Sequence, residues 1–95
     1  MKTLKDLAKG DYIAFGFNYN GGEPNEIIVN EIDEIYQGKF LVVFLYGDKS
    51  LSKFVNKEDI LAIGNDETGE AEIKNWSGKY DVLNPEEIDR ILARR

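Results

Sequence analysis

Aromatic, amide and acidic side chains meet in one turn-rich stretch, residues 19–25, which is the part of the sequence best suited to binding. Asn-Gly, Gly-Gly and a proline all occur within this stretch, and each favours a turn through its backbone preferences. Tyr19 and Asn20 open the stretch, and Glu23 lies near its end. Because aromatic faces and carboxylates both attract cations, we expect Tyr19, Asn20 and Glu23 to help hold a cationic or proline-rich ligand.

A second aromatic pair, Trp76 and Tyr80, lies on either side of a Ser77-Gly78 turn signal. Trp76 is the only tryptophan of the chain. Tryptophan and tyrosine are enriched among the residues that dominate binding energy at protein interfaces. The pair is therefore a candidate anchor for a protein partner, although for Trp76 itself we favour the alternative that it folds back as a lid on the hydrophobic core.

The residue types give little support to catalysis or metal binding. The chain has no cysteine and no histidine, so it lacks the commonest zinc ligands and the usual acid–base group near neutral pH. Acidic clusters occur at residues 31–34 and 66–72, but neither has the spacing of an EF-hand loop, and both are expected to be solvated. The sequence predicts no catalytic residue, no metal site and no cofactor.

The balance of charge narrows the class of partner. Eighteen acidic residues against twelve basic ones give a formal net charge of −6 over 95 residues. Non-specific binding to nucleic acid or to anionic membranes depends on Lys and Arg, so both partners are disfavoured. A protein partner is favoured, and the acidity points more weakly to a basic one. No apolar run is long enough to cross a bilayer and no signal peptide is recognisable, so a cytoplasmic location is expected.

Alternating apolar residues predict a mainly β fold that positions these side chains. The expected strands are residues 11–18, 26–36, 40–46, 51–56 and 60–63, with a further hairpin within residues 65–83. In the first strand, Ile13, Phe15 and Phe17 share one face, which assigns both phenylalanines to the core.

Two of the expected strands carry irregular apolar patterns. Residues 26–36 change phase between Val29 and Ile32, which predicts a bulge or a bend. Residues 40–46 are apolar on both faces, so this strand needs cover on both sides.

Residues 84–95 carry the best-specified element, a C-terminal helix. Asn84 is a good N-cap and Pro85 suits the first helical position. One apolar stripe follows at helical spacing: Ile88, Ile91 and Leu92. We expect this stripe to cover the second face of residues 40–46. The alternative is that a second copy of the chain supplies that cover, which would make a homodimer.

Two segments follow a pattern typical of a small barrel. They are Leu7-x-x-Gly10-Asp11-Tyr12-Ile13 and Val55-x-Lys57-Glu58-Asp59-Ile60-Leu61-x-Ile63. Together they resemble an SH3-like barrel over residues 4–64, in which a "GD-aromatic-aliphatic" opening and a short turn before the closing strand recur. The resemblance implies a small antiparallel SH3-like barrel or rolled sheet, with the hairpin at 65–83 and the helix at 84–95 added in one domain, residues 1–95.

Barrels of this kind bind peptides, nucleic acid or other subunits, so fold alone does not define the function. The leading hypothesis is a non-enzymatic protein-interaction module, or an accessory or inhibitory subunit, that uses an acidic and aromatic surface. Acidic mimicry of nucleic acid, which would block a basic groove, is one form of it. The alternative is a barrel that sequesters a small ligand or nucleotide between residues 19–25 and 65–80. A carboxylate-based enzyme and a nucleic-acid-binding barrel are less favoured.

Overall fold

The computed structural model describes residues 3–64 and 80–94, and within them the chain is mainly β with a C-terminal helix, as predicted. The strands are β1 (Tyr12–Phe17), β2 (Glu26–Glu31), β3 (Glu34–Tyr36), β4 (Lys39–Tyr46), β5 (Lys49–Val55), β6 (Ile60–Gly64) and β7 (Tyr80–Val82). The helices are the short 3-10 turns η1 (Leu4–Asp6) and η2 (Lys57–Asp59) and the α-helix α1 (Pro85–Ala93).

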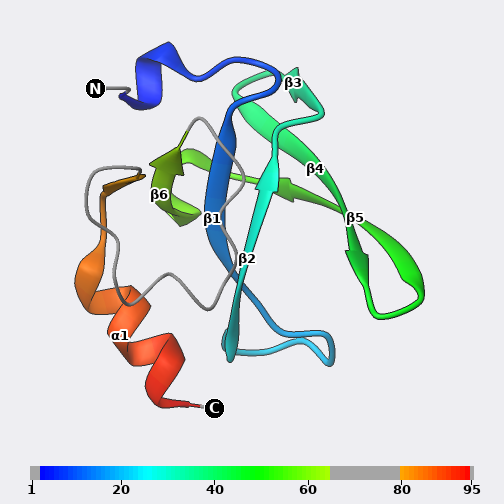
Figure 1. The fold of residues 1–95 in the computed structure, drawn as a ribbon, viewed down its shortest axis with the longest axis vertical. Helices are drawn as coiled ribbons and strands as arrows, with labels where there is room; N and C mark the ends of the chain where they lie inside the picture. The colour runs from blue at the N-terminus through cyan, green and yellow to red at the C-terminus, as the bar shows by residue number, and fades with distance from the viewer. Residues whose placement is uncertain (1–2, 65–79, 95) are drawn as a thin grey trace.

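The strands form two antiparallel sheets. One has the order β2-β1-β6-β7 and the other the order β3-β4-β5. In Figure 1 the β4–β5 hairpin projects on the right of the view, while α1 lies at the lower left. β1 is central to the larger sheet, because it pairs with β2 along one edge and with β6 along the other.

The irregularity predicted between Val29 and Ile32 is a break between β2 and β3, where the chain leaves one sheet and enters the other. Ile32 is buried at this break. Its N–H donates to the carbonyl oxygen of Asp11 at 2.8 Å, and its own carbonyl accepts from the N–H of Gly10 at 3.0 Å. The change of apolar phase therefore marks a change of sheet.

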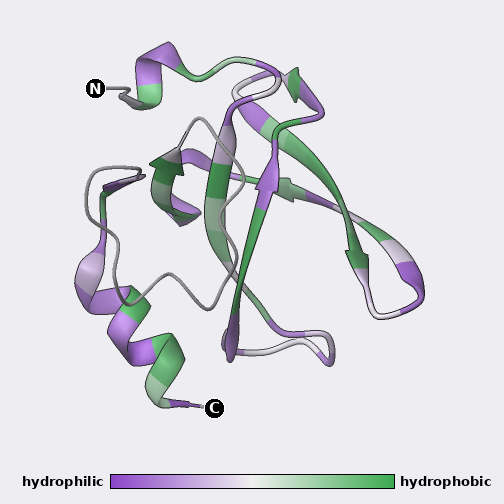
Figure 2. Cartoon of the chain, viewed as in Figure 1, coloured by the Kyte–Doolittle hydropathy of each residue, from purple (hydrophilic) through white to green (hydrophobic). Residues whose placement is uncertain are grey.

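Two layers of apolar side chains hold the sheets and the helix together, and the apolar stretches of β1 and β4 stand out in Figure 2. The first layer contains Leu7, Ile13, Phe15, Ile32, Phe40, Val42, Phe44, Val55, Ile60 and Ile63. The second contains Ala14, Ile27, Leu61, Ala62, Tyr80, Ile88 and Ile91. Phe15 is fully buried in the first layer and Phe17 packs at its margin, which confirms their assignment to the core.

The C-terminal helix begins where the sequence predicts. The side-chain oxygen of Asn84 accepts a hydrogen bond from the N–H of Glu87 at 3.3 Å, and Pro85 occupies the first helical position. Ile88 and Ile91 are buried, so the apolar stripe does dock on a sheet.

The prediction that this stripe covers β4 is wrong. Ile88 and Ile91 belong to the layer over β1, β2 and β6, and α1 lies on the other side of the molecule from the β4–β5 hairpin (Figure 1). The reason lies in β1 and β6, where Ala14 and Ala62 face each other across the pair. Their small side chains leave room for a helix on a sheet face that is itself apolar.

Of the hairpin expected within residues 65–83, the structure describes only β7, which pairs antiparallel with β6. The remainder of that prediction falls on residues 65–79, outside the described residues.

Candidate functional site

The loop between β1 and β2, residues 18–25, is held by the side chain of Asn18. Its oxygen accepts from the N–H of Asn20 at 3.0 Å, and its nitrogen donates to the carbonyl oxygen of Glu23 at 2.8 Å. Gly21 and Gly22 both have positive φ angles, 83° and 85°, which glycine adopts without steric cost. The turn signals in the sequence therefore produce an ordered loop that presents Tyr19 and Asn20 at the surface.

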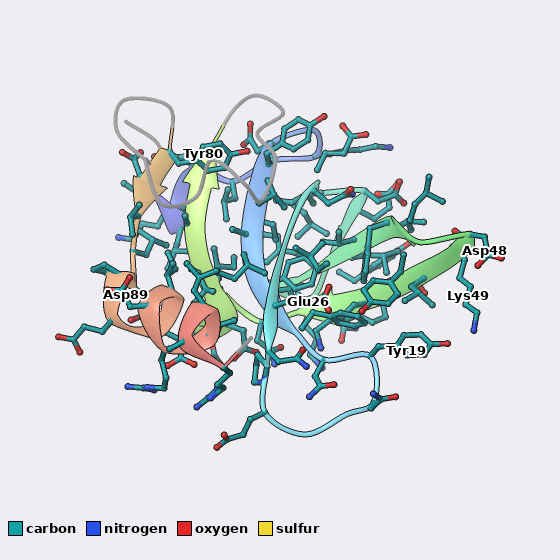
Figure 3. All side chains as sticks on the ribbon, turned by 60° about the horizontal axis from the view of Figure 1, so that its bottom comes forward. Tyr19, Glu26, Asp48, Lys49, Tyr80 and Asp89 are labelled. Carbon is teal, nitrogen blue, oxygen red and sulfur yellow. The ribbon has the colours of Figure 1, made fainter. Side chains whose placement is uncertain are left out.

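Tyr19 is packed against the end of the β4–β5 hairpin. Its ring stacks on that of Tyr46 with centroids 5.2 Å apart and an interplanar angle of 4°. Its hydroxyl accepts a hydrogen bond from the ammonium of Lys49 at 2.6 Å, and the two side chains lie together in Figure 3. Tyr19 nevertheless remains 45% exposed, so it is a fixed aromatic surface and not a core residue.

The ammonium of Lys49 lies at the hydroxyl end of the Tyr19 ring. It is 5.1 Å from the centroid of the Tyr19 ring but only 2.6 Å from the hydroxyl oxygen. These two distances place the nitrogen beyond the hydroxyl and not above the face of the ring. A cation above the ring would gain more from the π system.

Tyr46, the ring on which Tyr19 stacks, is itself held by a hydrogen bond. Its hydroxyl donates to a carboxylate oxygen of Glu26 at 2.7 Å. This hydrogen bond, together with desolvation and the negative charge of Glu26, raises the pKa of Tyr46 above its ordinary value of 10.0. Tyr46 is thereby kept protonated, as a donor, and its ring is held in place for the stacking with Tyr19.

Glu23 lies at the other side of the loop, toward α1. A guanidinium nitrogen of Arg94 is 3.2 Å from its carboxylate, and another donates to the carbonyl oxygen of Pro24 at 3.1 Å. Because both contacts come from one side chain, the loop is fastened to the C-terminal end of the helix.

A cleft of about 320 Å³ lies between this loop, η2 and α1. It opens because β6 pairs with β1 only as far as Phe15, which leaves the end of β1 without that neighbour among the described residues. The apolar lining residues are Phe15, Gly16, Pro24, Leu61 and Ile91. The polar lining residues are Lys53, Glu58, Asp59, Asn84 and Glu87. The cleft therefore has an apolar floor and a rim in which three acidic side chains face one basic one.

The predicted site residues do not form one surface. Tyr19, Asn20 and Glu23 share the β1–β2 loop, but Tyr80 lies on the far side of the molecule (Figure 3). Tyr80 is only 6% exposed and its ring packs on Gly64, where an added Cβ would lie 2.5 Å from it. Trp76 lies outside the described residues.

The cleft could not be recognised from the sequence. In the sequence, Glu58 and Asp59 belong to the short turn before a strand, and Glu87 belongs to the first turn of the C-terminal helix. No local pattern brings them together, because the cleft is made by segments that are distant in sequence. The sole signal available was Gly16, whose lack of a side chain lets Pro24 and Ile91 approach β1 closely.

No group of three or more Asp, Glu, His or Cys side chains in residues 3–64 and 80–94 is placed to hold a metal ion. No helix in that part of the chain is long and apolar enough to span a membrane. Comparison with protein families, with curated proteins and with solved structures found no match to this chain.

Proposed function

We propose that this protein is a non-enzymatic interaction module built on an SH3-like barrel, and that it binds a basic segment of a partner protein. Two features support the barrel. β1 starts directly after Gly10-Asp11, and the short turn η2 precedes β6, which pairs with β1 as a closing strand would. The two sheets share one apolar layer, as the walls of a small barrel do.

The observation that carries the proposed function is the cleft with its apolar floor and acidic rim. A lysine or arginine side chain suits such a cleft, because its methylene stem can lie on apolar atoms while its charged end reaches carboxylates. Glu87 already bonds to Arg90, so Glu58 and Asp59 supply most of the charge that a partner would meet. The net charge of −6 would add long-range attraction for a basic partner.

The loop next to the cleft supplies the aromatic part of the same surface. Tyr19 is exposed, fixed by Tyr46 and Lys49, and carried on the loop that also provides Pro24 to the cleft. A partner that extends from the cleft along this loop would therefore meet an ordered aromatic ring. An inhibitory subunit that covers a basic groove of its target is one form of this function.

A panel of short fluorescent peptides tests the proposal, each with Lys or Arg flanked by apolar residues, beside the same peptides carrying Glu. We expect the basic peptides alone to bind, with affinity that falls as salt is raised. The double variant Glu58→Gln/Asp59→Asn should weaken binding roughly three- to thirtyfold at low salt. Glu31→Gln, which removes an exposed carboxylate outside the cleft, should leave it unchanged.

Failure of every basic peptide at concentrations up to about 1 mM, or equal binding by the double variant, would reject the proposal. Native mass spectrometry of the purified protein separates it from the small-ligand alternative. A co-purified small molecule that the double variant loses would favour a sequestering barrel.

A further inference from the structure

The outer face of the β3-β4-β5 sheet carries a continuous apolar patch. The register of the sheet places on this face Glu34, Tyr36, Lys39, Leu41, Val43, Leu45, Ser50, Ser52 and Phe54. Leu45 is 78% exposed, Tyr36 53%, Phe54 52% and Val43 42%. We refer to Tyr36, Leu41, Val43, Leu45 and Phe54 as the outer patch.

The outer patch is not covered by α1, which packs on the other sheet. The opposite face of β4 is already used, since Phe40, Val42 and Phe44 are buried in the core between the sheets. From these exposures and side-chain areas of roughly 150–250 Å² for each aromatic residue, the patch offers about 400–500 Å² of apolar surface. A patch of this size falls within the range of the largest apolar patch on a typical monomer, and that patch is often functional.

The charge of this face favours a second copy of the chain as its occupant. Two molecules that each carry a net charge of −6 repel one another over most of their surfaces. The outer face carries one acidic residue, Glu34, and one basic residue, Lys39, and Glu34 is further compensated by Lys9 at 3.1 Å. Two copies can therefore meet on this face without bringing like charges together.

The shape of the face is complementary to itself. One end of the patch is bulky, because Tyr36 and Phe54 contact each other with ring centroids 6.2 Å apart. At the other end Leu45 lies opposite Ser50, and Ser52 lies opposite Val43 between the two ends. A two-fold axis can lie in the plane of the interface, parallel to the line from Val43 to Ser52. Rotation about this axis places the bulky end of each copy on the small end of the other.

We infer that the outer patch is the interface of a symmetric homodimer in which the two β4 strands lie face to face and antiparallel. Under this axis Leu41 meets Leu45 of the second copy, and Val43 meets its own counterpart. The buried area is near the lower limit for specific interfaces, so we expect a reversible dimer with a dissociation constant on the order of micromolar. This interface is separate from the acidic cleft. A protein that does not dimerise through the outer patch would therefore not count against the proposed function.

Sedimentation velocity over a range of protein concentrations tests this inference, starting from a monomer of 10.8 kDa. We expect a shift to twice that mass as concentration rises. Leu45→Glu should weaken the dimer at least tenfold while keeping the melting temperature measured at low concentration. Leu83→Glu, at a residue 42% exposed outside the patch, is the matched control and should leave the dimer unchanged.

Cross-linking tests the register independently, since the chain has no native cysteine. Val43→Cys should form a disulfide-linked dimer under mild oxidation much faster than Leu83→Cys. A protein that stays monomeric at every concentration, or a dimer that Leu45→Glu leaves intact, would overturn the interface. Equal cross-linking rates at residues 43 and 83 would overturn the antiparallel register.

Discussion

Arg94, at the C-terminal end of α1, donates a hydrogen bond to the carbonyl oxygen of Pro24 in the β1–β2 loop. The same side chain contacts the carboxylate of Glu23. One wall of the acidic cleft is therefore fastened to the helix that forms another wall. The loop owes its position to α1 as well as to its own turn residues.

Replacing Arg94 by methionine should loosen the loop with little effect on global stability. Both ionic partners are partly or largely exposed, so the free energy of unfolding should fall by less than about 1 kcal/mol. Hydrogen exchange at Gly21 and Gly22 should accelerate several-fold, because the loop loses its contact with the helix. Arg90→Met, which removes the contact to Glu87 inside the helix, is the control. Unchanged exchange in the Arg94 variant would refute the role assigned to this contact.

Gly16→Ala should destabilise the protein through crowding at the floor of the cleft. A Cβ at this position would lie 2.8 Å from Cβ of Pro24 and 2.9 Å from Cδ1 of Ile91. Relief of such contacts requires backbone or side-chain shifts that cost about 1–3 kcal/mol. Urea denaturation measures the loss.

The companion variant for this prediction is Ile91→Val, which removes the Cδ1 atom. The double variant Gly16→Ala/Ile91→Val should lose less stability than the sum of the two single variants. The reason is that valine lacks the Cδ1 atom with which a Cβ at residue 16 would clash. Strict additivity would show that Ile91 does not limit the space at Gly16.

The docking of α1 can be tested by comparing two leucine-sized side chains on opposite faces of the molecule. Ile91→Ala should cost about 2–5 kcal/mol, because Ile91 is 1% exposed between the helix and the larger sheet. Leu45→Ala, measured at low protein concentration, should change stability by less than about 0.5 kcal/mol. Thermal or urea unfolding of both variants decides the matter. A loss at Leu45 as large as the loss at Ile91 would show that Leu45 is covered, and would favour docking of the helix on the outer face of β4.

Much of the fold could be predicted from the sequence, because local rules determine it. The change of apolar phase between Val29 and Ile32 has no solution within one flat strand, and the break between β2 and β3 is its outcome. Asn84 and Pro85 specify the start of α1 through backbone chemistry that does not depend on the rest of the chain. These signals act over a few residues, so they can be recognised in the sequence alone.

The docking of α1 and the candidate surfaces could not be predicted in the same way. An apolar stripe shows that a helix must be covered but not by which sheet, and here the small side chains of Ala14 and Ala62 decide it. The sequence places Tyr19 in a turn-rich loop, whereas its partners Tyr46 and Lys49 come from a hairpin that meets the loop only in the folded chain. Contacts of this kind carry no local signature.

Because of the hydrogen bond between Tyr46 and Glu26, the free energy of unfolding should fall at alkaline pH. This hydrogen bond raises the pKa of Tyr46 in the folded protein above the ordinary value of 10.0 that applies when the chain is unfolded. The stabilisation is therefore complete below pH 10.0 and is lost as the pH rises through the folded-state pKa. Ultraviolet absorbance of the phenolate, compared between the wild type and Tyr46→Phe, isolates the titration of this residue.

Glu26→Gln should lower the pKa of Tyr46, because the neutral amide no longer opposes the negative charge of the phenolate. Glu31→Gln is the matched control, because Glu31 lies on the same strand and is not the residue bonded to Tyr46. It should leave the pKa of Tyr46 unchanged. The wild type should also lose stability above pH 10.0 by an amount that Tyr46→Phe does not lose. A Tyr46 that titrates at or below 10.0 in the wild type, or one that Glu26→Gln does not shift, would show that this hydrogen bond is not formed in solution.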